Sequence, residues 1–394
     1  MKTVLIATTY KGYNFGTSLQ AYASKLFISK MGYVGEIIWY KDFLAKGRDI
    51  RIRKILMILL RIISSPSLFK KTILIYKNSF EREIGEESKV FFKKFAEDKL
   101  NVKKMYWYEL KKYAKSNDVI ASICGSDQIW NATNIYIDPI YYLKFSPQER
   151  RVAYAPSFGK DQIPNYNKNI IKKNIEKIKY ISVREEQGVN IIKELLGKDV
   201  PVMLDPTLLI QREQWINESV NYLAKIEEDY ILLYFLDSPS QMAMKYINRV
   251  VEKFGLKVIA IPNMHTEFQK FPNYVIKNVG PLEFVNLVAH AKFVCTDSFH
   301  GTAFSVNLNI PFITFKREYG AASDQSSRII SLLSNLKLED RYISDNEAEL
   351  DLLGLSFEVS EKILENEREK AKEYLIQAFT SIESLYRHEG SDEK

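Results

Sequence analysis

Short apolar runs alternate with amphipathic segments along most of the chain, in the order of a strand followed by a helix. Residues 4–8 have the composition of a buried strand, and residues 18–30 carry apolar side chains at helical spacing. Residues 36–40 predict a second strand. Strands that alternate with helices are typical of a parallel sheet covered on both faces, so the pattern predicts an α/β fold.

The alternation is interrupted at residues 43–117, where Lys/Phe-rich segments predict a helical insertion, and again at 207–228, which predicts a linker with a short helix. Outside these two breaks the pattern repeats to the end of the chain. Further strands are predicted at residues 118–127, 152–157, 180–185, 200–207, 230–236, 257–262, 293–297 and 311–315, with helices at 240–254, 281–291, 301–307, 325–336 and about 358–387.

The length of 394 residues allows two domains. We expect two Rossmann-like domains that face a cleft, in a glycosyltransferase-B-like arrangement. Residues 1–207, with the insertion, would form the acceptor side, and residues 208–355 the donor side; residues 356–394 would form a C-terminal helix and tail. Ligands are expected where the carboxyl ends of the strands meet the cleft.

Positive charge is concentrated in one segment. Nine Lys or Arg residues and one acid, Asp49, fall between Lys46 and Phe80, so this segment holds more than the whole formal net charge of +7. A local excess argues against general nucleic-acid binding, which uses a basic face built across a fold. Residues 50–63 mix cations with apolar side chains, which suits either contact with an anionic membrane surface or packing against protein.

Cysteine usage and hydropathy indicate the compartment. The two cysteines, Cys124 and Cys295, have neither zinc-site spacing nor a disulfide framework, which favours a reducing environment. The first apolar run is short and has no small-residue cleavage site, and no run of 18 apolar residues occurs. We therefore expect a cytoplasmic protein, with peripheral attachment to the inner face of the cytoplasmic membrane through residues 46–80 as a further hypothesis.

Three polar clusters follow predicted strands, at the edge of the sheet where ligands bind. In the first, Gly16 lies between Asn14 and Gln20 at a helix start, where free backbone amides attract anions. The alternative is a simple helix cap.

The second cluster is GSDQIWN at residues 125–131. Asp127 and Gln128 could hold sugar hydroxyls, beside Ser126 and Asn131, and Trp130 could stack on a sugar face. The alternative is an Asp-capped helix with a buried tryptophan.

The third cluster is DSFHGT at residues 297–302. His300 lies at a helix start, where the helix dipole should lower its pKa and a bound phosphate should raise it. A histidine near neutrality can donate or accept a proton during turnover. A lone histidine is more often structural, but the polar residues around this one favour a functional role.

Cations at strand ends suit an anionic ligand. Arg184 ends one predicted strand, Lys316 follows another, and Arg328 lies in a predicted helix. A guanidinium grips a carboxylate or phosphate with two hydrogen bonds. Most arginines are solvated or paired with acids instead, so Lys316 and Arg328 stay open between the two interpretations.

Six segments, taken in order, resemble the polysaccharide pyruvyl transferase family. They are NFGTSLQAYA (14–23), GSDQIWN (125–131), YAPSFG (154–159), SVREEQG (182–188), LDPTLL (204–209) and DSFHGTAFSVNLNIPFITF (297–315). The resemblance implies a glycosyltransferase-B-like fold, phosphoenolpyruvate as the donor substrate, and no obligatory metal or other cofactor. It also implies that Arg184 holds the donor, and that Phe299 and His300 contact it, with the histidine implicated in catalysis.

The reaction implied by the resemblance protonates the methylene carbon of the donor, adds a sugar hydroxyl to C2, releases phosphate and closes a cyclic ketal with a second hydroxyl. The acceptor would be a cell-surface polysaccharide or its lipid-linked precursor. Such a reaction needs an acid, a base and cations for the phosphate. We assign His300 as the acid or the phosphate contact, and Asp127 or Asp297 as the base.

The candidate site residues therefore fall into two groups. The donor group is Arg184, Ser298, Phe299, His300, Gly301, Lys316 and Arg328, and the acceptor group is Asn14, Gly16, Gln20, Ser126, Gln128, Trp130 and Asn131. Two alternatives remain: a nucleotide-sugar-dependent glycosyltransferase of the same architecture, and a non-catalytic sugar-binding scaffold in capsule assembly, in which Arg184 and His300 would be structural.

Overall fold

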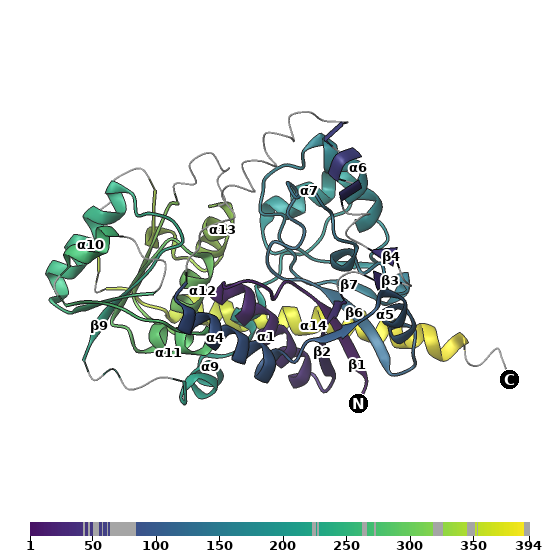
Figure 1. Ribbon diagram of the computed structural model, residues 1–394, viewed down its shortest axis with the longest axis horizontal. Coiled ribbons are helices and arrows are strands. Elements are labelled where there is room, and N and C mark those ends of the chain that lie inside the picture. The colour runs from purple at the N-terminus through teal and green to yellow at the C-terminus, as the bar shows by residue number, and fades with distance from the viewer. Residues whose placement is uncertain are drawn as a thin grey trace.

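A computed structural model describes most of the chain. The described residues are 1–41, 84–222, 226, 228–261, 266–271, 273–317, 326–344, 351–352 and 354–389, with short pieces at 44–45, 48–49, 55–56, 58–60 and 62–63. They contain two parallel six-stranded sheets, each with helices packed beside it, and a short antiparallel pair, β3 (Leu44–Ala45) with β4 (Arg48–Asp49). Figure 1 shows the two sheets side by side.

The first sheet is built around β1, whose five residues are all buried. Its strand order is β5-β2-β1-β6-β7-β8, and every pairing is parallel. This is the 3-2-1-4-5-6 order of a Rossmann domain, whose ligand crevice lies between the first and fourth strands. The strands are β1 (Thr3–Ala7), β2 (Val34–Tyr40), β5 (Lys103–Met105), β6 (Val119–Cys124), β7 (Arg151–Ala153) and β8 (Tyr180–Ile181).

The second sheet repeats the same topology. Its order is β11-β10-β9-β12-β13-β14, again with parallel pairings throughout. The expected pair of Rossmann-like domains in a glycosyltransferase-B-like arrangement is therefore confirmed. The strands are β9 (Tyr230–Tyr234), β10 (Lys257–Ala260), β11 (Tyr274–Ile276), β12 (Phe293–Thr296), β13 (Phe312–Phe315) and β14 (Tyr342–Ile343).

Helices follow most strands, as the amphipathic segments predict. The α-helices are α1 (Phe15–Lys30), α4 (Glu86–Phe95), α5 (Trp107–Ala114), α6 (Asn165–Ile175), α7 (Glu186–Leu196), α8 (Pro206–Leu209), α9 (Arg212–Ser219), α10 (Gln241–Phe254), α11 (Pro281–His290), α12 (Phe299–Asn307), α13 (Ser327–Asn335) and α14 (Glu358–Glu389). A π-helical turn, η1 (Ala96–Leu100), continues α4, and short 3₁₀ turns occur at η2 (Pro139–Tyr142), η3 (Gln148–Arg150), η4 (Thr266–Lys270) and η5 (Glu339–Arg341).

The segment predicted as a helical insertion at 43–117 differs from that expectation. β5 pairs with β2 through Lys103–Met105, and α5 follows it, so residues 103–114 are a strand and helix of the Rossmann sheet itself. α4 packs instead toward the second domain, where the Ser88 hydroxyl accepts a hydrogen bond from the Val279 backbone amide at 3.0 Å. The prediction failed because β5 is only three residues long and carries two lysines.

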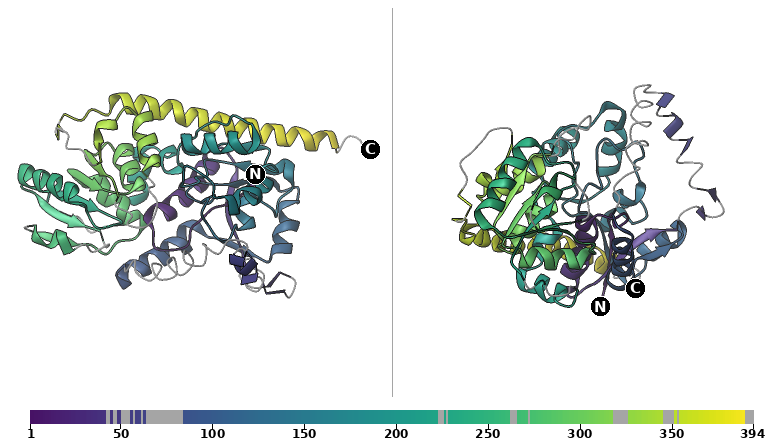
Figure 2. Two further views of the ribbon diagram at one scale, coloured as in Figure 1. Left: turned by 90° about the horizontal axis from the view of Figure 1, so that it is seen from above. Right: turned by 60° about the vertical axis from the view of Figure 1, so that its left-hand side comes forward.

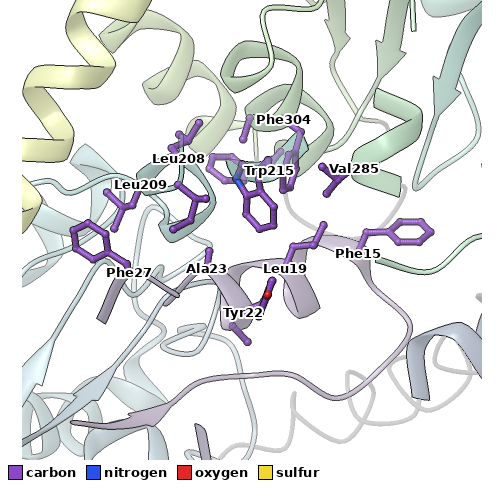
Figure 3. Close-up of a cluster of buried hydrophobic side chains, with 14 of the residues drawn as sticks. Phe15, Leu19, Tyr22, Ala23, Phe27, Leu208, Leu209, Trp215, Val285 and Phe304 are labelled. Atoms are coloured by element: carbon purple, nitrogen blue, oxygen red, sulfur yellow. The ribbon is translucent and has the colours of Figure 1, made fainter. Parts of the chain in front are cut away.

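An apolar core joins the two domains (Figure 3). The predicted linker folds into α8, which contacts α1 on one side and α12 on the other, and into α9, which contacts α11. Trp215 of α9 is fully buried between α1 and α12: its ring lies 5.1 Å from Phe304 and 6.3 Å from Tyr22, and its indole donates to the Thr207 carbonyl at 2.9 Å. The linker is therefore a packed wedge between the domains.

The predicted polar C-terminal helix is confirmed as α14, which runs along both domains (Figure 2). Arg368 of α14 donates to the Leu208 carbonyl and to the Asn307 side chain, both at 2.8 Å. The Asn307 amide in turn donates to the carbonyls of Thr207 and Ile210, each at 2.9 Å. One polar network thus connects α12, the linker and the C-terminal helix.

No helix in the described part of the chain is long and apolar enough to cross a membrane. Most of the basic segment 46–80, including Arg51, Arg53 and Lys54, lies outside the described residues. Its contact with a membrane surface stays a prediction.

Trp215→Ala should destabilise the protein by about 3–5 kcal/mol, because it removes the largest side chain of the interdomain wedge and leaves a cavity. Urea unfolding should show a lower midpoint, with Trp215→Phe intermediate between the variant and the wild type. A loss below about 1 kcal/mol would mean that the domains do not depend on this wedge.

Candidate functional site

The polar clusters expected from the sequence follow the central strands of both sheets. Residues 8–14 follow β1 and residues 125–127 follow β6; in the second sheet, residues 235–237 follow β9 and residues 297–300 follow β12. Each pair of loops flanks the crevice where the strand order reverses. Helices α1 and α12 contact each other, and both contact α8, so the two crevices lie next to each other. The candidate site lies at these contacts, beside the loop before α8.

Asp205 lies at the centre of these contacts. Its carboxylate is fully buried and accepts hydrogen bonds from Arg184 Nη1 at 2.7 Å, the Ser126 hydroxyl at 3.0 Å and the Thr207 hydroxyl at 2.8 Å. His300 Nε2 lies 3.8 Å away. Burial acts to raise the pKa of Asp205, but the His300 and Arg184 side chains and the Thr207 amide outweigh burial and lower this pKa far below its usual range. Asp205 is therefore ionised at neutral pH.

The Arg184 guanidinium is buried among three carboxylates. Besides Asp205, its guanidinium lies 3.8 Å from carboxylate oxygens of Asp127 and Glu185, and it stacks 4.5 Å above the centre of the Phe299 ring. Its Nε and Nη2 have no hydrogen-bond partner among the described residues. Buried donors are normally paired, so this position suits an anionic ligand.

His300 occupies the first turn of α12, beside the first turn of α1. A β-carbon on Gly16 would fall 1.9 Å from His300 Nδ1, so only glycine allows this approach. The Ser298 hydroxyl accepts a hydrogen bond from the Gly301 amide, and Asn14 caps α1 by accepting from the Thr17 amide. Two helix N-termini, which favour negative charge, therefore meet at the imidazole.

Asp127 completes the cluster. It adopts a left-handed backbone conformation with φ of 58°, which is uncommon for a residue with a side chain and is often found at functional sites. Its carboxylate accepts from the Thr17 hydroxyl at 2.9 Å. Burial acts to raise the pKa of Asp127, but Arg184, His300 and Arg328 outweigh burial, so this pKa is lowered overall. Asp127 is therefore ionised at neutral pH.

A cavity of about 310 Å³ extends from this cluster. Arg184, Asp205 and Phe299 line it together with Arg328 of α13 and Lys370 of α14. The Arg328 guanidinium lies 5.8 Å from the centre of the Phe299 ring, on which Arg184 also stacks. The structure thus brings the predicted donor residues Arg184, Phe299 and Arg328 to one cavity, next to His300.

Other predicted residues lie elsewhere. Both carboxylate oxygens of Asp297 accept hydrogen bonds, from the amides of Leu236 and Asp237 and from Arg317 Nε at 3.2 Å. Burial raises the pKa of Asp297, against the influence of Arg317. Asp297 therefore fastens the loop after β9 and does not face His300. Lys316 directly follows β13.

Three residues expected to bind an acceptor are buried instead. The Gln20 amide nitrogen lies within hydrogen-bonding distance of Thr8, Thr9 and Thr17, and the Ser126 hydroxyl lies within hydrogen-bonding distance of the Ala155 carbonyl and Asp205. Trp130 is fully buried, donates to the Tyr141 carbonyl at 3.0 Å and stacks on Tyr142, so it cannot stack on a sugar. The buried-tryptophan alternative describes it correctly.

Gln128 and Asn131 are partly exposed and hydrogen-bonded to each other at 2.9 Å. A β-carbon on Gly159 would lie 2.8 Å from the Gln128 side-chain oxygen, so the loop after β7 packs closely against this pair. These two residues remain candidates for acceptor contact.

The sequence reasoning missed Asp205 as a site residue. The available signal was LDPTLL, an aspartate and proline directly after an apolar segment and before a helix. The Asp205 side chain also caps α8 by accepting from the Thr207 amide, which is the ordinary role of an aspartate before Pro. Its role at the centre of the candidate site depends on contacts with Ser126, Arg184 and His300, which are distant in sequence.

Comparison with known proteins adds two findings. The sequence profile of the family described as polysaccharide pyruvyl transferase matches residues 14–319. A search of curated proteins finds no significant match.

Several solved structures resemble the fold distantly. E. coli heptosyltransferase WaaC with ADP is 12% identical, with a TM-score of 0.40, and the match covers 93% of this chain and 99% of that one. The glycosyltransferase SnogD from Streptomyces nogalater is 11% identical, with a TM-score of 0.42 and coverage of 96% and 99%. UDP-GlcNAc 2-epimerase from Neisseria meningitidis is 11% identical, with a TM-score of 0.45 and coverage of 96% and 100%.

Asp205→Asn should destabilise the protein by about 3–5 kcal/mol at neutral pH, because it leaves Arg184 buried without its closest counter-charge. The folded-state pKa of Asp205 lies below its unfolded value, so the carboxylate stabilises the fold above about pH 4 and loses this effect only as the pH falls further. In urea unfolding, the gap between variant and wild type should stay constant from pH 8 to pH 5 and narrow in stronger acid. A gap that does not depend on pH in acid would contradict the ion pair.

Proposed function

The chain belongs to the polysaccharide pyruvyl transferase family, and we propose that it transfers the pyruvyl group of phosphoenolpyruvate to two hydroxyls of a sugar, forming a cyclic ketal and releasing phosphate. The observation that carries this proposal is the buried cluster of Arg184, Asp205, Asp127 and His300 at two helix N-termini. It combines a site for a small anion with a proton donor and an ionised base.

Phosphoenolpyruvate carries a carboxylate and a phosphate, and the cavity beside the cluster offers separate cations for them. Two guanidinium nitrogens of Arg184 have no hydrogen-bond partner among the described residues, and the side chain is fixed by Asp205 and Phe299, so it can grip one anionic group without reorganising. Arg328, whose guanidinium lies 5.8 Å from the centre of the Phe299 ring, and the first turn of α12 would hold the second group.

The chemistry needs one proton delivered to the donor and one removed from each attacking hydroxyl. His300 would protonate the methylene carbon, which becomes the methyl group, while positive character develops at C2. The first sugar hydroxyl bonds to C2 and gives its proton to Asp127. The bond from C2 to the phosphate oxygen then breaks, the second hydroxyl bonds to C2, and its proton leaves with the phosphate. The proton held by Asp127 returns to His300 through solvent, which restores both groups for the next turnover.

Asp205 has a supporting role in this proposal. It supplies a negative charge 3.8 Å from His300 Nε2, which compensates for the charge of the imidazole when it carries a proton. It also orients Arg184 through the 2.7 Å ion pair. Asp127 is a better candidate base than Asp297, because the oxygens of Asp297 are occupied by the loop after β9 and by Arg317.

The acceptor would be a cell-surface polysaccharide or its lipid-linked precursor, with the reaction at the cytoplasmic face of the membrane. Attachment through the basic segment 46–80 would bring the protein to such an acceptor.

Phosphoenolpyruvate should raise the thermal midpoint of the wild type, by the equivalent of about 2.7 kcal/mol at 100 times its dissociation constant. Arg184→Ala should abolish this shift, whereas Arg212→Ala, which removes an exposed arginine on α9, should leave it unchanged. A wild-type midpoint unmoved by saturating phosphoenolpyruvate would overturn the proposal.

Gly16→Ala should reduce phosphate release by about 10²-fold, because the added carbon displaces the His300 ring by an ångström or more. His300→Ala should cost a similar factor, within about 10² to 10⁴. Ser24→Ala, which removes only a hydrogen bond within α1, is the matched control. Near-normal turnover in Gly16→Ala would show that the position of the imidazole does not matter.

A further inference from the structure

Aromatic side chains gather at the carboxyl ends of the first sheet. Tyr10 follows β1, Trp39 and Tyr40 end β2, Trp107 begins the helix after β5, and Tyr141 lies in η2 after β6. These strands are neighbours in the order β5-β2-β1-β6, so their ends lie side by side. We call these five residues the aromatic cluster.

The rings of the aromatic cluster form one continuous set centred on Trp39. The Trp39 ring lies 5.7 Å from Tyr10, 5.3 Å from Tyr40 and 5.8 Å from Tyr141. Tyr40 lies 5.8 Å from Trp107, at an angle of 84°. Trp39 and Tyr40 are only 8% and 9% exposed, whereas Tyr10, Trp107 and Tyr141 are partly exposed. The cluster therefore has a buried floor and a rim that reaches solvent.

One end of the aromatic cluster adjoins the loop that carries Asp127, the proposed base: the Trp130 indole, three residues after Asp127, donates to the Tyr141 carbonyl at 3.0 Å. Burial is the main cause that raises the pKa of the Tyr141 hydroxyl, and the negative charges of Asp138 and Asp127 raise it further. The Tyr40 hydroxyl donates to Asp138 at 2.6 Å, which fixes the rings relative to this loop.

Polar groups accompany the rings. The Lys11 ammonium lies 4.8 Å from the centre of the Trp39 ring, and Lys41 lies at the same distance from Tyr106 beside the cluster. The Trp39 indole N–H has no hydrogen-bond partner among the residues that the structure describes. Aromatic faces carry partial negative charge and attract both cations and the C–H groups of a sugar ring.

We propose that the aromatic cluster is the acceptor subsite, where a sugar ring lies against Tyr10 and Trp107 with its reacting hydroxyls toward Asp127. This inference rests on the proposed function and identifies the acceptor surface. The aromatic cluster takes the acceptor-binding role that was expected for Trp130 and Gln20, which are buried and hydrogen-bonded within the protein. An aromatic floor with a cationic rim suits a saccharide, because one face of a sugar ring is apolar and its edge is hydroxylated.

Saturation-transfer NMR tests the proposal with methyl glycosides of galactose, glucose, mannose and N-acetylglucosamine as probes. At least one glycoside should receive magnetisation from the wild-type protein. Tyr10→Ala and Trp107→Ala should each weaken its binding by about three- to tenfold, the effect of losing one aromatic contact. Tyr10→Phe and Trp107→Phe, which keep a ring, should restore most of it. Phe254→Ala, which removes a partly exposed ring from α10 in the other domain, is the matched control.

The thermal shift with phosphoenolpyruvate, measured on the same variants, separates this inference from the proposed function. We expect the shift to persist in Tyr10→Ala and Trp107→Ala, which also shows that both variants fold. If no glycoside binds the wild type, or if binding is the same in both alanine variants, the aromatic cluster is packing and the inference is wrong, even when phosphoenolpyruvate binds. If a glycoside binds through the cluster but phosphoenolpyruvate does not bind, the sugar subsite stands and the donor assignment fails.

Discussion

The ion pair between Asp205 and Arg184 is the interaction on which the candidate site depends. Two opposite charges lie 2.7 Å apart, both almost completely buried, and such a pair is stable only when its remaining hydrogen-bonding groups are also satisfied. Asp205 meets this condition through Ser126 and Thr207. Arg184 does not, because two of its nitrogens have no hydrogen-bond partner in the described chain. Burying a guanidinium with unsatisfied donors costs free energy. A bound anion would offset this cost by accepting hydrogen bonds from these nitrogens.

The contact between the domains gives this ion pair its chemical setting. The first turn of α1 reaches the first turn of α12 because residue 16 is glycine, and this brings His300 within 3.8 Å of Asp205. The wedge of α8 and α9, with Trp215 buried inside it, fixes the distance between the two helices. Arg368 of α14 fastens the same wedge through the Leu208 carbonyl and Asn307. The site thus consists of groups from both domains, held together by an apolar core directly beneath them.

Sequence patterns predicted the long elements and most side chains of the candidate site, but not the contacts among them. Strands such as β1 and β9 are unbroken apolar runs, so they were found; β5, β11 and β14 are two or three residues long and owe their existence to the neighbouring strand. Residues 200–207 have strand composition but form only a single bridge, between Val183 and Val202. His300, Arg184 and Asp127 were identified because their motifs follow strands. Gln20 and Trp130 could not be distinguished from ligand-binding residues, since their partners Thr8 and Tyr142 become neighbours only in the fold.

The reaction products test most directly whether the cluster transfers a pyruvyl group. The protein would be incubated with [2-¹³C]phosphoenolpyruvate and a panel of free and lipid-linked oligosaccharides, and ¹³C and ³¹P NMR would follow the labelled carbon and the phosphate together. The account predicts that inorganic phosphate appears in equal amount with a ketal carbon attached to the glycan, and that Arg184→Ala forms neither. Intact phosphoenolpyruvate, together with release of a nucleoside diphosphate when nucleotide sugars are supplied with the same acceptors, would contradict it.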